Sequence, residues 1–203
     1  MKEKSIIGII IIFLALLAVV FYLGSRNTST SVPETTIDVT AEPLPLRGAK
    51  DTTYTIDGQE ISLVGSVLEK ESAPGSAAKI RISIFGDLTL GDVNGDGQND
   101  AALILTQDGG GSGTFYYLAV AYSTSTGIVG TNALLLGDRI APETLEIRDG
   151  LVIVNYATRK SDEPMTAAPS VGVSLYAHFY DGVLIDVTKE VTKERSVKKT
   201  IVE

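Results

Sequence analysis

The chain has 203 residues, of which 44% are hydrophobic and 21% charged, a length and composition that suit one packed domain with accessory segments. Seventeen Lys and Arg against 25 Asp and Glu give a net charge of −8, so no nucleic acid partner is expected. The sequence has no Cys and one His. This composition excludes disulfides, thiolate zinc sites and Cys nucleophiles, and it argues against imidazole catalysis.

Residues 6–23 form an uncharged apolar run, IIGIIIIFLALLAVVFYL. As a helix this run is roughly 27 Å long, close to the hydrocarbon thickness of a bilayer, and we expect residues 1–24 to form one transmembrane anchor. Lys2 and Lys4 precede the run and Arg26 follows it. This charge bias predicts a single-pass protein of the cell membrane, with a cytoplasmic N-terminus and an extracytoplasmic domain. A cleaved signal peptide is the alternative, although the run exceeds the usual length of about 15 apolar residues.

Residues 25–50 are rich in Ser, Thr and Pro and contain few large apolar side chains. So few apolar groups do not offset the entropy cost of ordering a chain. We therefore expect a disordered tether that holds the following domain away from the membrane. On this interpretation, a fragment that starts near Asp51 folds as well as one that starts at Arg26.

Residues 51–187 carry the expected fold. Asp-Gly pairs at 57–58, 149–150 and 181–182 each lie between two short apolar runs, and they predict three β-hairpins because Asp-Gly supplies the positive φ angles of a two-residue turn. Further strand candidates are residues 79–85, 101–106, 114–123 and 131–136. A short helix is an option within residues 65–78. The pattern predicts a mainly β domain, either an antiparallel sandwich or a partly closed barrel.

Residues 188–203 mix five cations with three anions and contain little apolar surface. We expect a charged tail that is either frayed or a short surface helix. Its small positive charge gives little reason to expect contact with an anionic polymer.

One motif indicates a specific chemistry. Residues 92–100 follow the pattern DxNxDGxxD, in which oxygen-bearing groups recur at every second position. Calcium is a hard cation that takes six to eight oxygen ligands, and a Gly at the sixth position permits the sharp turn of such a loop. The pattern predicts a Ca²⁺ site whose ligands are Asp92, Asn94, Asp96, the carbonyl of Gln98, and Asp100.

The flanks of this motif determine which kind of calcium loop it is. An EF-hand has a bidentate Glu at position 12 and a helix on each side, whereas position 12 here is Leu103. Alternating isoleucines precede the motif and an apolar run follows it. The loop is therefore predicted to join two strands.

The segments FGD at 85–87, LGDVNGDG at 90–97 and DAAL at 100–103 resemble the FG-GAP repeat of integrin-type propellers, whose calcium lies in a hairpin loop. The resemblance implies the same ligand set. It covers about twenty residues, and because the motif occurs once it does not imply a propeller. Residues 53–58, 113–117 and 136–142 are also similar to a recurrent membrane-anchored, extracytoplasmic bacterial domain of unassigned activity, which implies a location and no mechanism.

Other residue groups could form a site. Carboxylate pairs that a hydrolase could use as acid and base are Asp162 with Glu163, and Glu143 with Glu146. Tyrosines 116, 117 and 122 could stack on a sugar or a peptide, although neighbouring strand residues face opposite sides and at least one of the first two belongs in the core. Arg139 and Arg159 could bind an anion, but a structural role is favoured because the domain is acidic.

The sequence therefore favours a membrane-anchored, extracytoplasmic β domain with a structural calcium site. Its partner is expected to be an envelope protein, a peptide or a glycan, and no catalytic residue is assigned. Two alternatives stay open, a cell-surface hydrolase of envelope polymers and a dedicated glycan- or peptide-binding module.

Overall fold

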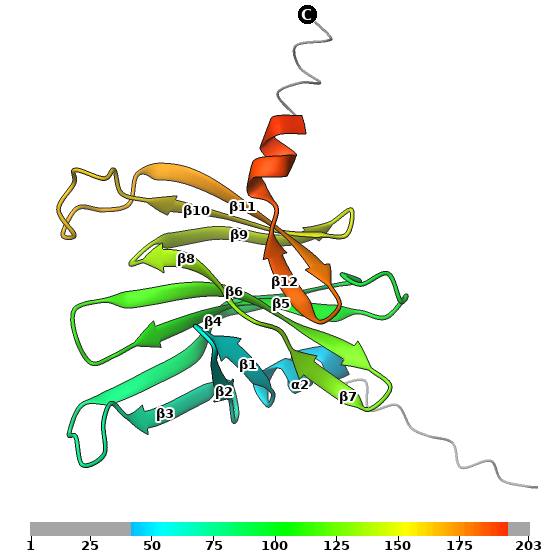
Figure 1. The fold of residues 1–203 in the computed structure, drawn as a ribbon, viewed down its shortest axis with the longest axis horizontal. Coiled ribbons are helices and arrows are strands. Elements are labelled where there is room, and N and C mark those ends of the chain that lie inside the picture. The colour runs from blue at the N-terminus through cyan, green and yellow to red at the C-terminus, as the bar shows by residue number, and fades with distance from the viewer. Residues whose placement is uncertain (1–41, 195–203) are drawn as a thin grey trace, which may run out of the picture. The chain divides into compact units, whose positions relative to one another are not determined.

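In the computed structural model, the described part of the chain is residues 42–194. The expected transmembrane anchor, most of the expected tether and the end of the tail lie outside it. Within residues 42–194, no helix is long and apolar enough to cross a membrane. The described part is mainly β, with antiparallel pairing between the strands of each sheet (Figure 1).

The elements follow one another with short connections. In chain order they are α2 (Leu44–Lys50), β1 (Thr53–Ile56), β2 (Gln59–Ser62), β3 (Val67–Glu71), β4 (Lys79–Gly91), β5 (Asp100–Asp108), β6 (Thr114–Thr124), β7 (Gly127–Gly130), β8 (Leu134–Asp138), β9 (Ala141–Arg148), β10 (Leu151–Thr158), β11 (Val171–Tyr180) and β12 (Val183–Asp186). Residues 188–194 are helical after β12.

The three predicted hairpins are confirmed. The aspartates at their turns have φ angles of 50°, 53° and 48°, and the following glycines have 77°, 72° and 80°. These positive values are the geometry for which Asp-Gly is suited. The hairpins are β1–β2, β9–β10 and β11–β12.

The other strand candidates are also found, with two differences. The candidate at 131–136 is a regular strand only from Leu134 onward, because Thr131 still bonds to Val120 of β6 whereas Asn132 forms an isolated bridge with Thr55 of β1. The optional helix within 65–78 is absent, and β3 lies there instead. Residues 69–71 are compatible with a helix, yet they pair with β4 residues 79–81, so tertiary pairing overrides local propensity.

A six-stranded sheet lies at the centre of the fold. Its order is β3-β4-β5-β6-β7, and β8 also pairs with β6. Alternate side chains of β5 and β6 enter two different apolar clusters, and residues 101–105 are buried without interruption. These strands therefore read as continuous apolar runs because both of their faces are covered.

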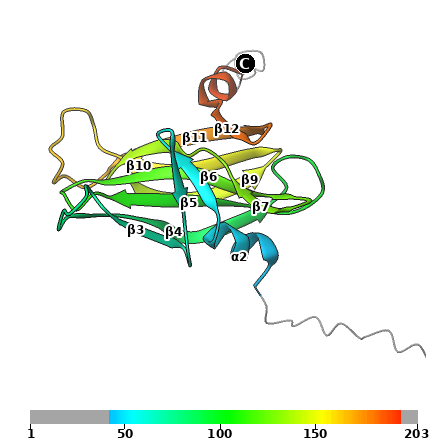
Figure 2. The same cartoon turned by 60° about the horizontal axis from the view of Figure 1, so that its bottom comes forward.

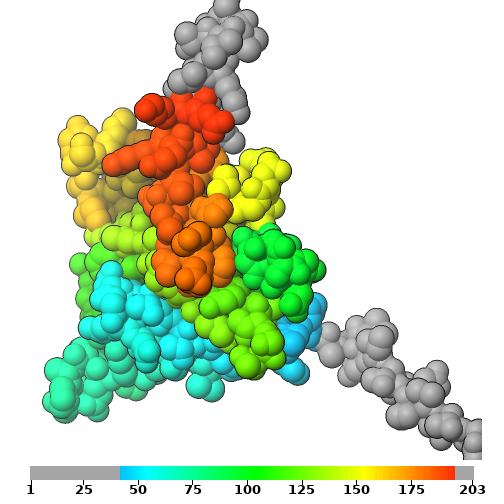
Figure 3. All heavy atoms as spheres, turned by 45° about the vertical axis from the view of Figure 1, so that its right-hand side comes forward, coloured from blue at the N-terminus to red at the C-terminus, as the bar shows by residue number. Residues whose placement is uncertain are grey.

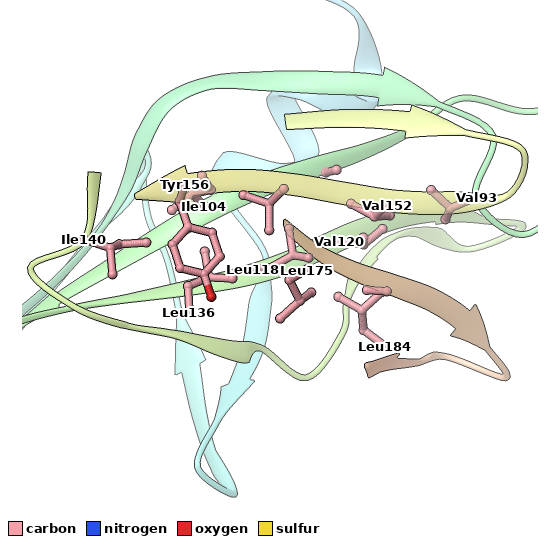
Figure 4. Close-up of a cluster of buried hydrophobic side chains, with 13 residues drawn as sticks. Val93, Ile104, Leu118, Val120, Leu136, Ile140, Val152, Tyr156, Leu175 and Leu184 are labelled. Atoms are coloured by element: carbon pink, nitrogen blue, oxygen red, sulfur yellow. The ribbon is translucent and has the colours of Figure 1, made fainter. Parts of the chain in front are cut away.

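A four-stranded sheet, ordered β12-β11-β10-β9, covers one face of the central sheet. Figure 4 shows the cluster between them, which joins Ile104, Leu118 and Val120 of the central sheet to Val152 and Leu175 of the second sheet. The antiparallel sandwich is therefore confirmed, whereas the sheets do not close into a barrel.

The β1–β2 hairpin and α2 cover the opposite face; they lie below β5 and β6 in Figure 1, and the hairpin crosses in front of the central strands in Figure 2. The hydroxyl of Tyr54 donates a hydrogen bond to the carbonyl of Ala49 at 2.7 Å, and both residues are fully buried. A Cβ atom added to Gly48 would overlap the side chain of Ile128, so the helix approaches β7 at a distance that only glycine permits.

The expected tether is therefore too long at its C-terminal end. Residues 44–50 form α2, which packs on the domain, and the prediction of a disordered segment up to residue 50 is wrong there. The composition of this segment gave no sign of order, because α2 fully buries only Ala49 and depends on the small size of Gly48 for its contact. The tail follows the helical alternative as far as residue 194, and its first turn is tied to β11 by a bond from the Tyr176 N–H to Thr188 Oγ1 at 3.0 Å.

One short segment connects all three layers. Thr131 is buried, its Oγ1 accepts the Val120 N–H of β6, and its carbonyl accepts the Thr55 N–H of β1. The side-chain amide of Asn132 forms two bonds with the backbone of Leu184 in β12, at 2.7 and 3.0 Å. Thr131 and Asn132 thus link the hairpin layer, the central sheet and the edge of the second sheet.

A truncation tests whether α2 belongs to the domain. A fragment of residues 51–203 should melt several degrees below a fragment of residues 42–203, because it loses the packing of α2 and leaves the buried Tyr54 hydroxyl without its acceptor, a cost of about 1 to 3 kcal/mol. Gly48→Ala should lower the melting temperature of the longer fragment, although alanine is the better helix former. Equal melting temperatures for the two fragments in differential scanning calorimetry would contradict the docking of α2.

A substitution tests the link through Asn132. Asn132→Ala removes two partly buried hydrogen bonds to Leu184 and should destabilise the domain by about 2 kcal/mol in urea unfolding. The matched control is Asn99→Ala, because Asn99 contributes a backbone acceptor and no side-chain hydrogen bond within the described part of the chain. An Asn132→Ala effect no larger than the control would show that this link is dispensable.

Candidate metal centre and its surroundings

The predicted calcium loop connects β4 to β5. The last ladder pair before it is Gly91 with Asp100, so the prediction that the loop joins two strands is confirmed. The loop lies at the surface, as the green lobe beside the β11–β12 hairpin in Figure 3. The structure places the side chains of the predicted ligands in two settings, with Asp92, Asn94 and Asp96 inside the loop and Asp100 at the start of β5.

The side-chain oxygens of the loop accept hydrogen bonds from its own backbone. The two carboxylate oxygens of Asp92 accept the N–H groups of Gly95 at 2.7 Å and Gly97 at 2.9 Å. Oδ1 of Asn94 accepts the Asp96 N–H at 2.9 Å, and Oδ1 of Asp96 accepts the N–H of the next-but-one residue at 2.8 Å. Gly95 and Gly97 have φ angles of 79° and 82°. The loop therefore turns around its acidic side chains.

Asp100 anchors the loop to the core. Its side chain is fully buried, and its two oxygens accept the Val93 N–H at 3.0 Å and the Ser123 N–H of β6 at 2.9 Å. Val93 is itself buried and lies at one end of the core cluster in Figure 4. One carboxylate therefore connects the start of the loop, the start of β5 and the end of β6.

The charges of the loop affect one another. The Gly97 N–H is the main cause that lowers the pKa of the Asp92 carboxyl below its usual value. Burial is the main cause that raises the pKa of Asp100, and the negative charges of Asp96 and Asp92 raise it further, while the two backbone N–H donors oppose the rise. A cation bound in the loop would attract each of these carboxylates and so offset the repulsion between them.

The donor set suits calcium in its chemistry. Each carboxylate or amide oxygen that accepts one N–H keeps a second lone pair, and such backbone bonds orient metal ligands in the same way as other outer-shell contacts. The loop supplies hard oxygen donors and no nitrogen or sulfur donor, as calcium prefers. In residues 42–194, no three His, Cys, Asp or Glu side chains converge closely enough to form a metal-binding group as they are placed.

The other candidates mostly have structural roles. Arg139 forms bonds with Asp138, and Arg159 donates to the carbonyls of Arg139 and Ala167, so the favoured structural role of these arginines agrees with their contacts. Tyr117 is in the core and Tyr116 is partly buried, as strand alternation predicted. Among the carboxylates considered for a hydrolase, Glu146 forms an ion pair with Arg148 and Glu163 forms one with Lys160.

A groove that the sequence did not indicate lies between β4 and β9. It has a volume of about 260 Å³, and Asp87 and Glu143 both line it beside the exposed ring of Phe85. These residues are 56 positions apart in the sequence. The sequence spacing does not predict that they share a groove, because their positions depend on a register shift in β4 and another in β9.

Comparisons with known proteins add no relative. A scan against protein-family models found no match, and searches of curated proteins and of solved structures also found none.

Proposed function

We propose that this chain is a single-pass, membrane-anchored, extracytoplasmic β domain that binds Ca²⁺ for stability and acts as an interaction module of the cell envelope. The calcium part is supported by the loop of residues 92–99, in which acidic side chains are held on a short turn that Asp100 fixes to the core. Asp92, Asn94, Asp96 and Asp100 would supply side-chain oxygens, and Gln98 its carbonyl. Bound calcium would neutralise these charges, and the chain's own N–H donors would orient the ligands.

The location is supported by the sequence alone. The apolar run at 6–23 and the Lys residues before it favour a cytoplasmic N-terminus. Extracellular calcium concentrations would fill even a weak site, since modules of this kind bind at about 10⁻⁴ to 10⁻³ M.

A hydrolase is the weaker of the remaining alternatives. The groove between β4 and β9 contains two carboxylates, as a glycosidase requires. The general acid of a glycosidase is enclosed by apolar surface, whereas both Asp87 and Glu143 are exposed to solvent. The groove is therefore better suited to binding than to acid catalysis.

Thermal unfolding tests the calcium site. Calcium at a hundredfold excess over its Kd should stabilise the fragment of residues 42–203 by about 2.7 kcal/mol, or roughly 5 to 10 °C. Asp96→Ala should abolish this increment and spare the melting temperature in chelator. The control Asp108→Ala, outside the loop, should keep the full calcium response. Equal melting temperatures in calcium and in chelator for the unchanged fragment would refute the site.

Protease accessibility tests the topology. If residues 6–23 span the membrane with the N-terminus inside, protease added to intact spheroplasts should remove the β domain, because it lies outside the cytoplasm. A cytoplasmic marker protein should stay intact in the same sample. Protection of the domain until the membrane is lysed would contradict the proposed location.

A further inference from the structure

The groove lies between β9, an edge strand of the four-stranded sheet, and the part of β4 that follows its pairing with β3. A hydrogen bond joins these strands, in which Thr89 Oγ1 donates to the Leu145 carbonyl at 2.9 Å. Beyond this contact lies the groove of about 260 Å³, with Ile104 of β5 and Pro142 of β9 among its apolar residues. It is large enough for one side chain, and smaller than the pockets of about 300 Å³ or more that hold drug-sized ligands.

Both acidic residues of the groove lie on β-bulges. In β4, Phe85 lies opposite Ile104 and Thr89 opposite Ala102, so the three residues between them face a single residue of β5. In β9, the partners of Asn155 and Tyr156 are Thr144 and Pro142, which leaves Glu143 without a partner. Bulges commonly change the direction of a side chain at functional sites. Here two bulges in different sheets supply Asp87 and Glu143 to one groove.

In the described part of the chain, neither carboxylate of the groove is in an ion pair, and Lys50, which lines an adjoining hollow with Asp87, pairs with Glu42. In residues 42–194, the side chains of Asp87 and Glu143 have no ion-pair or hydrogen-bond partner, whereas Glu69, Glu146 and Glu163 each pair with Lys or Arg. Two unpaired carboxylates in one groove produce a local negative potential that attracts a cation.

Phe85 supplies an aromatic surface beside these charges. Its side chain is 41% exposed. Its ring meets Tyr116 edge to face, with centroids 5.4 Å apart and an angle of 76° between the rings, and this contact limits its orientations. A carboxylate beside the face of an aromatic ring is the chemistry that recognises an organic cation.

We propose that this groove binds a Lys or Arg side chain of a partner peptide, with the charged head between Asp87 and Glu143 and the aliphatic stem against Phe85 and Pro142. A metal ion is the poorer occupant, since two carboxylates and threonine hydroxyls fall short of six to eight oxygens. The inference rests on the interaction part of the proposed function and does not depend on calcium.

Disulfide exchange measures the preference of the groove for a cation. Thr144 is a suitable position for a probe because it lines the groove and is exposed. It is replaced by Cys in the full chain, which contains no other Cys, and the protein is kept in detergent micelles. The variant is equilibrated with equal amounts of cystamine and bis(2-hydroxyethyl) disulfide, whose adducts differ by an ammonium or a hydroxyl. Intact mass spectrometry gives the ratio of adducts. Relative to Ser112→Cys in the glycine-rich loop, the groove should favour the ammonium adduct by about fivefold.

Second substitutions in the Thr144→Cys variant show whether the groove residues, rather than the acidic surface as a whole, cause the preference for the ammonium adduct. Asp87→Asn and Glu143→Gln should each lower the preference, and Phe85→Leu should lower it without changing the charge. Asp149→Asn, at a remote turn, should leave it unchanged. If Thr144→Cys does not fold, Pro142→Cys replaces it. A ratio equal to that of Ser112→Cys, or one that Asp87→Asn and Glu143→Gln leave unchanged, would overturn the proposal.

Competition identifies the source of the cation. The tripeptide acetyl-Gly-Lys-Gly-amide should slow the reaction of the Thr144→Cys thiol with cystamine, whereas acetyl-Gly-Gln-Gly-amide should not. Protection by n-butylamine but not by the lysine peptide would overturn the peptide partner and assign a free amine. The calcium site is tested by the melting temperature and the groove by the adduct ratio. Either prediction can therefore fail without the other. The adduct ratio should be the same in calcium and in chelator.

Discussion

The fold depends on a pair of central strands, β5 and β6, that is buried on both faces. One face packs on the four-stranded sheet and the other on the β1–β2 hairpin and α2. A polar group at such a position has no access to water and must find a partner. In the described part of the chain, the buried polar side chains are Asp100 and Thr131, and every buried side-chain nitrogen or oxygen atom there has a hydrogen-bond partner.

These two residues have corresponding roles at different places along the strand pair. Thr131 follows β7 and accepts the Val120 N–H of β6, and this segment also bonds to β1 and, through Asn132, to β12. Asp100 accepts N–H groups from the loop and from the end of β6. The proposed calcium loop is therefore fixed to the domain, because Asp100, the last of its proposed ligands, is also a buried acceptor of the central sheet.

One strand, β4, contributes to both proposed sites. Its bulge at residues 86–88 places Asp87 in the groove, Thr89 ties it to β9, and Gly91 lies so close to Ile147 that an added Cβ would be 3.0 Å from that side chain. The calcium loop begins at the next residue. These contacts hold the two sheets together between the groove and the loop. Each proposed site therefore adjoins a well-packed part of β4.

Residues with a local conformational requirement could be predicted from the sequence. Asp-Gly pairs predict hairpins because the turn needs positive φ angles, and all three occur. The DxNxDGxxD pattern located a loop between two strands, which the structure also shows. Features that depend on distant contacts could not be predicted in this way. The docking of α2 depends on Gly48 meeting Ile128, and β3 depends on pairing with β4. The groove depends on two bulges that no local signal marks.

Amide hydrogen exchange tests most directly whether calcium orders the loop that Asp100 anchors. The loop N–H groups of Gly95, Gly97 and Gln98 donate to the side chains of the proposed ligands. Bound calcium should fix these side chains and slow the exchange of the three amides, while exchange at the buried centre of β5 measured under native conditions changes much less. Exchange rates of the three loop amides that are the same in calcium and in chelator would contradict the account.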